Sequence, residues 1–244
     1  MRIPRIYVPQ TLHPGHEVEL PVQAGEHIAR VLRLDRGHPL RLFDGSGDEY
    51  EAELASLAKR SVTARVLEST EAEDRESPLR ITLAQGIARG EKMDWILQKA
   101  TELGVARIVP IMTDRTEVKL DPERAERRVA HWEAVVASAC EQCGRTRLPE
   151  VTEPLKLADW AASLDESAGQ RLALDPQGDR APRDLPASTH ATLAVGPEGG
   201  LSAHDLATLR AAGFHGLRLG PRILRTETAG LAALAAMQAL LGDL

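Results

Sequence analysis

Apolar residues follow two different periods along the chain, and the change between them falls near residue 70. Before that point, short segments alternate apolar and polar residues, which is typical of strands with one buried face. The predicted strands cover residues 5–9, 16–21, 39–45, 49–57 and 61–69. The stretch "DGSG", residues 44–47, has the composition of a hairpin turn between the third and fourth of them. We therefore expect a small β-barrel or sandwich in the first part of the chain.

One segment of this first part, "EHIARVLRLDR", has helical spacing instead. The apolar residues that can face inward on such a turn are Ile28, Val31 and Leu32. The basic residues that gather on its other side are His27, Arg30, Arg33 and Arg36. This basic cluster is a candidate contact for nucleic-acid phosphates, but a solvated face has the same composition.

After the charged stretch at residues 70–77, strands alternate with helices, which predicts an α/β domain. The predicted strands are residues 79–87, 106–113, 171–175, 191–196 and 216–220. The predicted helices are residues 90–104, a long one opened by Asp121 and Pro122, residues 202–213, and a last one from about Thr226. Such alternation indicates a mostly parallel sheet with ligands at the carboxyl ends of its strands. We place the domain boundary between residues 74 and 75, giving domains 1–74 and 75–244.

Composition narrows the classes of protein further. The chain has 244 residues, 43% of them hydrophobic and 27% charged, as in ordinary globular proteins. Its net charge of −6 argues against coating nucleic acid by bulk electrostatics, so any RNA binding requires a local face. We expect no membrane association and a cytoplasmic location, because the first residues lack the apolar core of a signal peptide. Cys140 and Cys143 form a lone C-x-x-C pair near a helix end closed by Gly144, so we expect no structural metal.

Three loops are expected to share the carboxyl edge of the parallel sheet: "DPQG", residues 175–178, "GPEGG", residues 196–200, and "GPRILRTETAG", residues 220–230. Glycines directly after a strand allow a ligand to approach the backbone closely. Ser202 can cap the following helix, with Asp205 as an acidic partner that reaches less far than glutamate. Neither phosphate-binding glycine motif is present, and Glu198 would repel a phosphate. A cationic or neutral ligand therefore fits this edge better.

The pair "VGPEGG" and "LGPRILRTETA" strongly resembles the signature of the RsmE family, SPOUT-class methyltransferases that methylate N3 of a uridine in small-subunit ribosomal RNA with S-adenosylmethionine. The resemblance extends to "HIARVLRL" and "LFDGSG" in the first part and to "KMDWILQKATELGV" and "EQCGR" in the middle. It implies a PUA-like RNA-binding β-barrel, a parallel α/β domain with a deep trefoil knot, and a homodimer. It also implies that small-subunit ribosomal RNA, free or in the assembled subunit, is the partner.

The resemblance also implies which residues hold the donor, S-adenosylmethionine. The expected donor-binding residues are Leu174, Gly196, Pro197, Glu198, Gly199, Gly200, Leu219, Gly220, Ile223, Leu224 and Thr226. The Glu198 carboxylate either faces the sulfonium or accepts backbone hydrogen bonds from a neighbouring loop, and we favour the second role. We further expect Gly199→Val to abolish donor binding in a folded protein, because a β-branched residue fills the pocket and resists the positive φ expected at Gly199.

Arg225 is the predicted catalytic side chain. Methylation at N3 needs a deprotonated imide. A permanently charged guanidinium can stabilise the uracil oxygens or hold the phosphate of the flipped nucleotide, but it cannot act as the base. A structural ion pair with Glu227 or with a carboxylate elsewhere is the alternative role. Phosphate contacts are assigned to Arg2, Arg5, Arg30 and Arg33.

The last helix suggests self-association. Its large apolar residues, Leu231, Leu234, Met237, Leu240 and Leu241, spread over more than one face. One packed face would leave the rest in water, which favours a dimer over complete burial in a monomer. Two other functions stay open: a SPOUT enzyme acting on another RNA or atom, including a ribose 2′-OH, and a non-catalytic ribosome-assembly factor.

Overall fold

The computed structural model describes residues 3–58, 61–70, 75–118 and 121–244. The chain divides into two units. The first comprises Met1–Glu76 with Cys140–Leu148, and the second comprises Ser77–Ala139 with Pro149–Leu244. The first unit is therefore built from two stretches of sequence that lie far apart along the chain.

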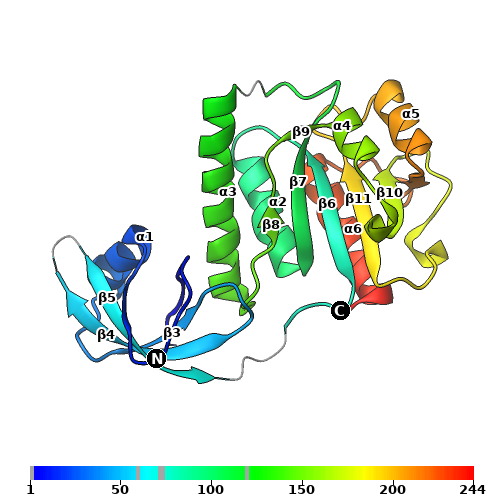
Figure 1. Cartoon of the computed structure of the whole chain (residues 1–244). Coiled ribbons are helices and arrows are strands. Elements are labelled where there is room, and N and C mark those ends of the chain that lie inside the picture. The colour runs from blue at the N-terminus through cyan, green and yellow to red at the C-terminus, as the bar shows by residue number, and fades with distance from the viewer. Residues whose placement is uncertain (1–2, 59–60, 71–74, 119–120) are drawn as a thin grey trace. The chain divides into compact units, whose positions relative to one another are not determined.

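The first unit contains a five-stranded sheet in the order β1-β3-β4-β5-β2. Figure 1 shows its curled central strands β3, β4 and β5. Its strands are β1 (Arg5–Tyr7), β2 (Glu17–Glu19), β3 (Pro39–Phe43), β4 (Glu49–Leu57) and β5 (Val62–Thr70). β1 pairs with β3 in parallel, and the other pairs are antiparallel. Alternate residues such as Leu40, Leu42, Leu54 and Ala64 are buried in one core. The predicted β-strands and the turn after Phe43 are confirmed.

The helical segment of this unit consists of α1 (Val22–Glu26) followed by a π-helical turn, η1 (His27–Leu32). Ile28 is buried as predicted, but Val31 is 66% exposed and Leu32 is 39% exposed. The prediction that Val31 and Leu32 face inward is wrong. A π-helical turn takes more residues than an α-helical turn, so the side chains after Ile28 rotate out of phase with an α-helical pattern.

The stretch Cys140–Leu148 completes the first unit through specific hydrogen bonds. The Tyr7 backbone N–H donates to Glu141 Oε1 at 3.0 Å, and Thr146 Oγ1 donates to the Gly47 carbonyl at 2.9 Å. Arg145, which is buried, pairs with Glu76 at 2.6 Å. Because these partners are so distant in sequence, local patterns do not reveal the contribution of this stretch to the first unit.

The second unit contains a seven-stranded parallel sheet with the order β12-β10-β11-β6-β7-β8, and β9 also pairs with β7. Figure 1 shows β10, β11, β6 and β7 of this sheet. The strands are β6 (Arg80–Gly86), β7 (Val105–Met112), β8 (Glu150–Val151), β9 (Leu155–Lys156), β10 (Gln170–Leu174), β11 (His190–Val195) and β12 (His215–Leu217). The parallel α/β sheet is confirmed. The two-residue strands β8 and β9 were not predicted, because they are too short to show a period.

Helices cover both faces of this sheet. The covering helices are α2 (Glu91–Glu102), α4 (Leu157–Ala162), α5 (Ala203–Ala211) and α6 (Thr226–Leu241). The chain also forms the long helix α3 (Pro122–Cys143) and short 3-10 turns at η2 (Glu166–Ala168) and η3 (Pro182–Asp184). α2 and α6 contact each other on one face (Figure 1). On the other face, Trp160 of α4 and Leu209 of α5 pack against Ala84, Val109 and Ala194 of the sheet.

The two cysteines lie at the end of α3, as expected. Both are free thiols, and Gly144 follows with φ 95° while its N–H donates to the Cys140 carbonyl at 3.0 Å. Burial raises the pKa of Cys140 to about 12. Among the described residues, no group of His, Cys, Asp or Glu is arranged to hold a metal ion. No helix in the described part of the chain combines the length and apolarity needed to cross a membrane.

Candidate functional site

The three predicted loops follow neighbouring parallel strands, so they meet at one edge of the sheet. β12, β10 and β11 are adjacent and parallel, and they end at Leu217, Leu174 and Val195. Gly178 and Gly216 approach so closely that a Cβ on Gly178 would lie 2.5 Å from the Gly216 carbonyl carbon. The structure therefore brings the loops together as the sequence predicts.

The glycine-rich turn after β11 is held by close backbone packing. A Cβ on Gly196 would lie 2.5 Å from the carbonyl carbon of Gly200, whose N–H donates to the Pro197 carbonyl at 2.8 Å. Gly86, at the end of β6, presses against the same turn, because its Cβ would lie 2.5 Å from Pro197 Cδ. These contacts leave no room for side chains, which explains the glycines on structural grounds.

The predicted positive φ at Gly199 is wrong, because the left-handed residue of the turn is Gly200 with φ 71°. Gly199 is constrained in another way. Arg115 Nη1 donates to the Gly199 carbonyl at 2.7 Å, and a Cβ on Gly199 would lie 3.1 Å from Arg115 Cβ. The arginine therefore covers this part of the turn.

Glu198 turns toward the segment that leads into α2. Its Oε1 accepts from the Arg89 backbone N–H at 3.0 Å and contacts Lys92 Nζ at 3.3 Å. Burial raises the pKa of Glu198, but the hydrogen bonds from Arg89 and Lys92 outweigh this effect, so the pKa lies below the usual value. This geometry matches the backbone-accepting role that we favoured for Glu198.

The helix after the turn begins with a complete capping box. Asp205 N–H donates to Ser202 Oγ at 2.9 Å, and Ser202 N–H donates to Asp205 Oδ2 at 2.8 Å. The shorter aspartate therefore reaches the cap. Ser202 Oγ also donates to Asp114 Oδ2 at 2.6 Å, which joins the helix start to the loop after β7.

The loop after β12 presents backbone and apolar side chains to open space. Gly220 has φ 84°, and a Cβ built on it meets no atom within 4 Å. Ile223 is 85% exposed, although it is a large apolar side chain, while Leu219 and Leu224 are half-buried. An exposed isoleucine beside an uncovered glycine is typical of a surface that a ligand covers.

Thr226 lies at the start of α6 and connects this loop to the glycine-rich turn. It is 7% exposed, and its Oγ1 donates to the Gly196 carbonyl at 2.6 Å. Gln85 Nε2 donates to Thr226 Oγ1 at 3.0 Å and to the Gly86 carbonyl at 2.9 Å. The side chain of Thr226 is therefore an internal anchor of the candidate site.

Arg225 is the N-cap residue of α6, and its side chain is exposed. Its carbonyl accepts from the N–H groups of Thr228 and Ala229 at 2.9 and 2.7 Å, which fixes its backbone. Within the described ranges, no ion pair joins its guanidinium to Glu227 or to another carboxylate. The guanidinium is therefore available to a ligand.

Sequence reasoning missed several residues of this edge. They are Gln85, Arg89, Lys92 and Arg115; Asp175 lies in the predicted loop 175–178, but no role was assigned to it. Asp175 is 6% exposed, accepts from the Gln177 N–H at 2.9 Å and pairs with Arg210 at 3.2 Å. Two of the missed residues carried a signal in the sequence: Lys92 begins the stretch "KMDWILQKATELGV" that resembles the RsmE family, and Gln85 is a polar residue near the end of a predicted strand.

The four arginines assigned to phosphate contacts differ in their surroundings. Arg30 is on the surface, with a side chain 76% exposed and Glu26 at 3.4 Å, and Arg33 is exposed with φ 51°. The Arg5 side chain is 13% exposed and forms an ion pair with Glu49 at 2.7 Å. Its guanidinium also donates to the Cys140 carbonyl at 2.8 Å and lies over the Phe43 ring. This placement argues against a phosphate contact by Arg5. Arg2 lies outside the described residues.

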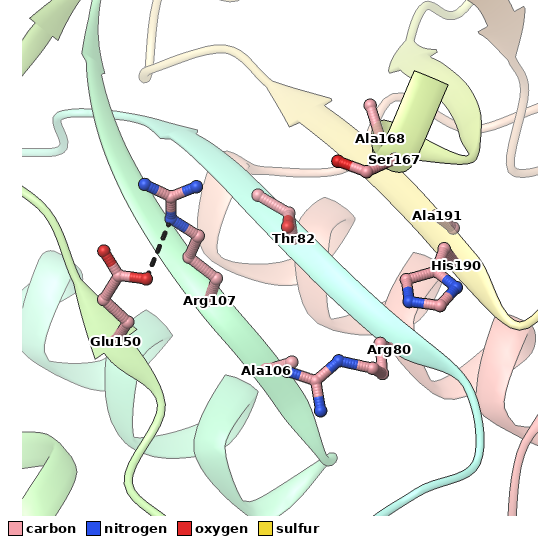
Figure 2. Close-up of a pocket in the computed structure, with 9 residues that line it drawn as sticks. All are labelled: Arg80, Thr82, Ala106, Arg107, Glu150, Ser167, Ala168, His190 and Ala191. Atoms are coloured by element: carbon pink, nitrogen blue, oxygen red, sulfur yellow. Dashed lines mark ion pairs between the residues drawn. The ribbon is translucent and has the colours of Figure 1, made fainter. Parts of the chain in front are cut away.

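A separate hollow of about 260 Å³ lies at the opposite end of the same sheet (Figure 2). Its lining residues are Arg80, Thr82, Ala106, Arg107, Glu150, Ser167, Ala168, His190 and Ala191. Arg80, Glu150 and His190 are the first residues of β6, β8 and β11, so the hollow is at the amino ends of the strands. Arg107 in this hollow is already paired with Glu150 at 3.2 Å. The loops predicted to bind the ligand are at the carboxyl ends, and the hollow is not part of that site.

Comparison with known protein families identifies the class of protein to which this fold and this loop-lined sheet edge belong. Residues 75–238 match the family model for the RNA methyltransferase domain, and residues 20–67 match that for the RNA methyltransferase PUA domain. The class is therefore that of RNA methyltransferases with a PUA domain.

Individual relatives define the family within this class. Ribosomal RNA small subunit methyltransferase E of Buchnera aphidicola subsp. Schizaphis graminum is 32% identical over 100% of this chain and 98% of its own length. The protein of the same name from Bacillus subtilis is 33% identical over 86% of this chain and 85% of its own. The chain belongs to the ribosomal RNA small subunit methyltransferase E family.

Solved structures agree with this assignment. Ribosomal RNA small subunit methyltransferase E from Neisseria gonorrhoeae, bound to S-adenosylmethionine, is 41% identical over 99% of both chains, with a TM-score of 0.92. A putative methyltransferase from Legionella pneumophila, in complex with the same molecule, is 40% identical over 100% of both chains, with a TM-score of 0.95.

Proposed function

We propose that this protein transfers a methyl group from S-adenosylmethionine to N3 of a uridine in small-subunit ribosomal RNA. The observation that carries the proposal is the pair of loops at the carboxyl edge, residues 196–200 and 218–225. Thr226, which directly follows the second loop, joins the two through the hydrogen bond from its Oγ1 to the Gly196 carbonyl. The family relationship and the donor-bound relatives support the choice of reaction.

The residues present fit this donor. The open backbone at Gly220 and the exposed side chain of Ile223 offer polar contacts and an apolar cover for the adenosine. We assign donor contacts to backbone and side-chain atoms of these two loops, with Leu174 at the end of the neighbouring strand. Glu198 acts indirectly, by holding the turn against Arg89. When bound, S-adenosylmethionine supplies an electrophilic methyl group.

The acceptor base, uracil, determines what else the site must do for methyl transfer. N3 lies on the pairing edge of uracil, so the uridine must be unpaired or turned out of its stack before transfer. N3 becomes nucleophilic as its proton leaves, and negative charge then spreads to the neighbouring oxygens. The free guanidinium of Arg225 stabilises that charge through hydrogen bonds, while the proton passes to water.

RNA binding is assigned to both domains, residues 1–74 and 75–244. In the first, Arg30 and Arg33 are exposed and suited to phosphate contacts, which supply affinity more than sequence choice. In the second, Arg222 and Arg225 are exposed in the loop that also carries Ile223. We expect the protein to act in the cytoplasm, where small ribosomal subunits assemble.

The trefoil knot and the homodimer stay predictions from the family resemblance. The surface of α6 supports the dimer, since Leu240 is 52% exposed while Leu234 and Met237 on the same helix are fully buried. Light scattering at micromolar concentration should give the mass of two chains. An active protein with the mass of one chain would contradict the dimer.

The decisive experiment compares ribosomal RNA from cells with and without this protein by nucleoside mass spectrometry. We expect N3-methyluridine to disappear from the small-subunit RNA when the gene is deleted and to return when it is restored. The purified protein should then methylate that RNA with S-adenosylmethionine. Equal N3-methyluridine in both strains would refute the proposed function.

A further inference from the structure

A buried glutamine lies directly beneath the junction of the two donor loops. Gln85 is the next-to-last residue of β6 and is 0% exposed. It pairs in register with Val195, the last residue of β11, so it lies next to the start of the glycine-rich turn. Its side chain belongs to the sheet face that α6 covers, since a Cβ on Gly230 of α6 would lie 3.5 Å from Gln85 Oε1.

The Gln85 amide connects three segments that are distant in sequence. Its Nε2 donates to the carbonyl of Gly86 in its own strand and to Thr226 Oγ1 at the start of α6, and it lies 3.5 Å from the Gly196 carbonyl in the turn. Thr226 Oγ1 donates its own hydrogen bond to the same Gly196 carbonyl at 2.6 Å. Thr226 Oγ1 accepts from Gln85 while donating to Gly196, so the two hydrogen bonds share one hydroxyl.

The oxygen end of the Gln85 amide has no hydrogen-bond partner among the residues that the structure describes. Gln85 Oε1 is buried and receives no hydrogen bond from the described residues. Burying an acceptor without a partner is unfavourable, and an apolar side chain of similar volume would avoid that cost. The amide is therefore a poor choice for core packing alone, which points to a use for its N–H groups.

We propose that Gln85 is a positioning residue for methyl transfer: its amide fixes Thr226 against Gly196 and thereby sets the place of Arg225 relative to the donor loops. Arg225 is joined to Thr226 by a single peptide bond and is held by Thr228 and Ala229 N–H groups in the first turn of α6. A shift of that turn moves the guanidinium directly. This proposal rests on the proposed function, because it assigns the loops to the donor.

The test compares Gln85→Met with Gln238→Met. Gln238 is a matched control: it is also 0% exposed, it donates to the Leu103 carbonyl at 3.0 Å and accepts from Ser77 Oγ at 2.7 Å, and it lies near the other end of α6. Both substitutions keep the side-chain length and remove the amide. Gln238→Met should lower thermal stability, because both ends of that amide are hydrogen-bonded, whereas only Gln85→Met should change the site.

The expected kinetic result is a fall in kcat of about 10²-fold in Gln85→Met, the size that a displacement of about 1 Å at a reacting centre produces. The KM for RNA should stay near that of the unmodified protein. Gln238→Met should keep the parental kcat at temperatures where it is folded. A parental kcat in folded Gln85→Met, or an equal loss in both variants, would overturn the proposal.

A second variant, Gln85→Glu, gives a pH signature and serves if Gln85→Met does not fold. A protonated carboxyl can donate its O–H to Thr226 Oγ1 in place of the amide, whereas an ionised carboxylate cannot. The ratio of the Gln85→Glu rate to the parental rate should therefore rise as the pH is lowered. A ratio that does not change with pH would refute the positioning role, because a purely volumetric effect does not titrate.

Hydrogen exchange separates this inference from the proposed function. The N–H groups of Thr228 and Ala229 bond to the Arg225 carbonyl, and they should exchange faster in Gln85→Met than in Gln238→Met, without any substrate. If the unmodified protein methylates no RNA, the proposed function fails, and equal exchange in the two variants would then refute the role of Gln85. Faster exchange only in Gln85→Met would preserve that role as an anchor of α6.

Discussion

Two buried glycines of the second unit, Gly86 and Gly230, should respond in opposite ways to replacement by alanine. Gly86→Ala should destabilise the unit, and Gly230→Ala should stabilise it. Gly86 ends β6, and a Cβ there would lie 2.5 Å from Pro197 Cδ and 2.8 Å from the Gly196 carbonyl carbon. Gly230 lies inside α6, where a Cβ would meet its nearest atoms at an ordinary 3.5 Å. Neither glycine has a positive φ, so the comparison isolates steric fit from backbone strain.

The magnitudes follow from these contacts. Gly86→Ala overpacks a site bounded by backbone, and we expect it to lower the free energy of unfolding by about 1–3 kcal/mol. Gly230→Ala removes a helix-interior glycine at no steric cost, and we expect a gain of about 0.5–1 kcal/mol. For a chain of this size the melting temperature should fall by about 2–12 °C in the first variant and rise by about 1–4 °C in the second.

The assay is urea and thermal unfolding of both variants beside the parent, followed by calorimetric titration of Gly86→Ala with S-adenosylmethionine. Because Gly86 presses on Pro197 and Gly196, Gly86→Ala should also bind the donor more weakly. A Gly86→Ala protein with parental stability and parental donor affinity would refute the close packing of the turn. A destabilised Gly230→Ala protein would refute the conclusion that α6 has room for a Cβ at Gly230.

Four further predictions concern individual side chains. Arg225→Ala should lower the single-turnover rate at saturating RNA and donor by about 10²-fold or more with donor affinity retained, and Arg225→Lys should recover part of it; a parental rate in the alanine variant would remove Arg225 from the mechanism. Reversing the charges of Arg30 and Arg33 should weaken RNA binding and reduce the slope of log K against log salt by about one for each lost contact, and unchanged values would identify a solvated face. Because burial raises its pKa to about 12, the Cys140 thiol should resist iodoacetamide in the folded protein at neutral pH and react in urea, as peptide mass spectrometry would show. The lowered pKa of Glu198 stabilises the fold above the usual glutamate range, and this contribution is lost as the pH falls through the lowered value; the difference in unfolding free energy between the parent and Glu198→Gln should therefore shrink on acidification.

Local pattern was sufficient for much of the fold. The strand predicted at residues 49–57 is β4 (Glu49–Leu57), because alternation from Glu49 to Leu54 defines its buried face and the preceding hairpin turn defines its start. The capping box of Ser202 and Asp205 was equally legible, since it depends on residues three positions apart. The gathering of the three loops followed from the parallel order of the strands.

Features that depend on distant partners could not be predicted. Arg5 looked like a surface cation until Glu49 and the Cys140 carbonyl were found around its guanidinium. Gln85 has no motif of its own, because its partners Gly196 and Thr226 are more than a hundred residues away. Such contacts depend on tertiary packing, which a local period does not encode.

The two-part composition of the first unit has a consequence for its synthesis on the ribosome. Tyr7 and Gly47 belong to the earliest part of the nascent chain, but their partners Glu141 and Thr146 are translated only after β6, α2 and β7. The five-stranded sheet can therefore form its core while the chain is growing, yet Tyr7 N–H and the Gly47 carbonyl must wait for their hydrogen bonds. Vectorial synthesis thus couples the completion of the first unit to emergence of the second, and a fragment ending at residue 76 lacks part of its own native structure.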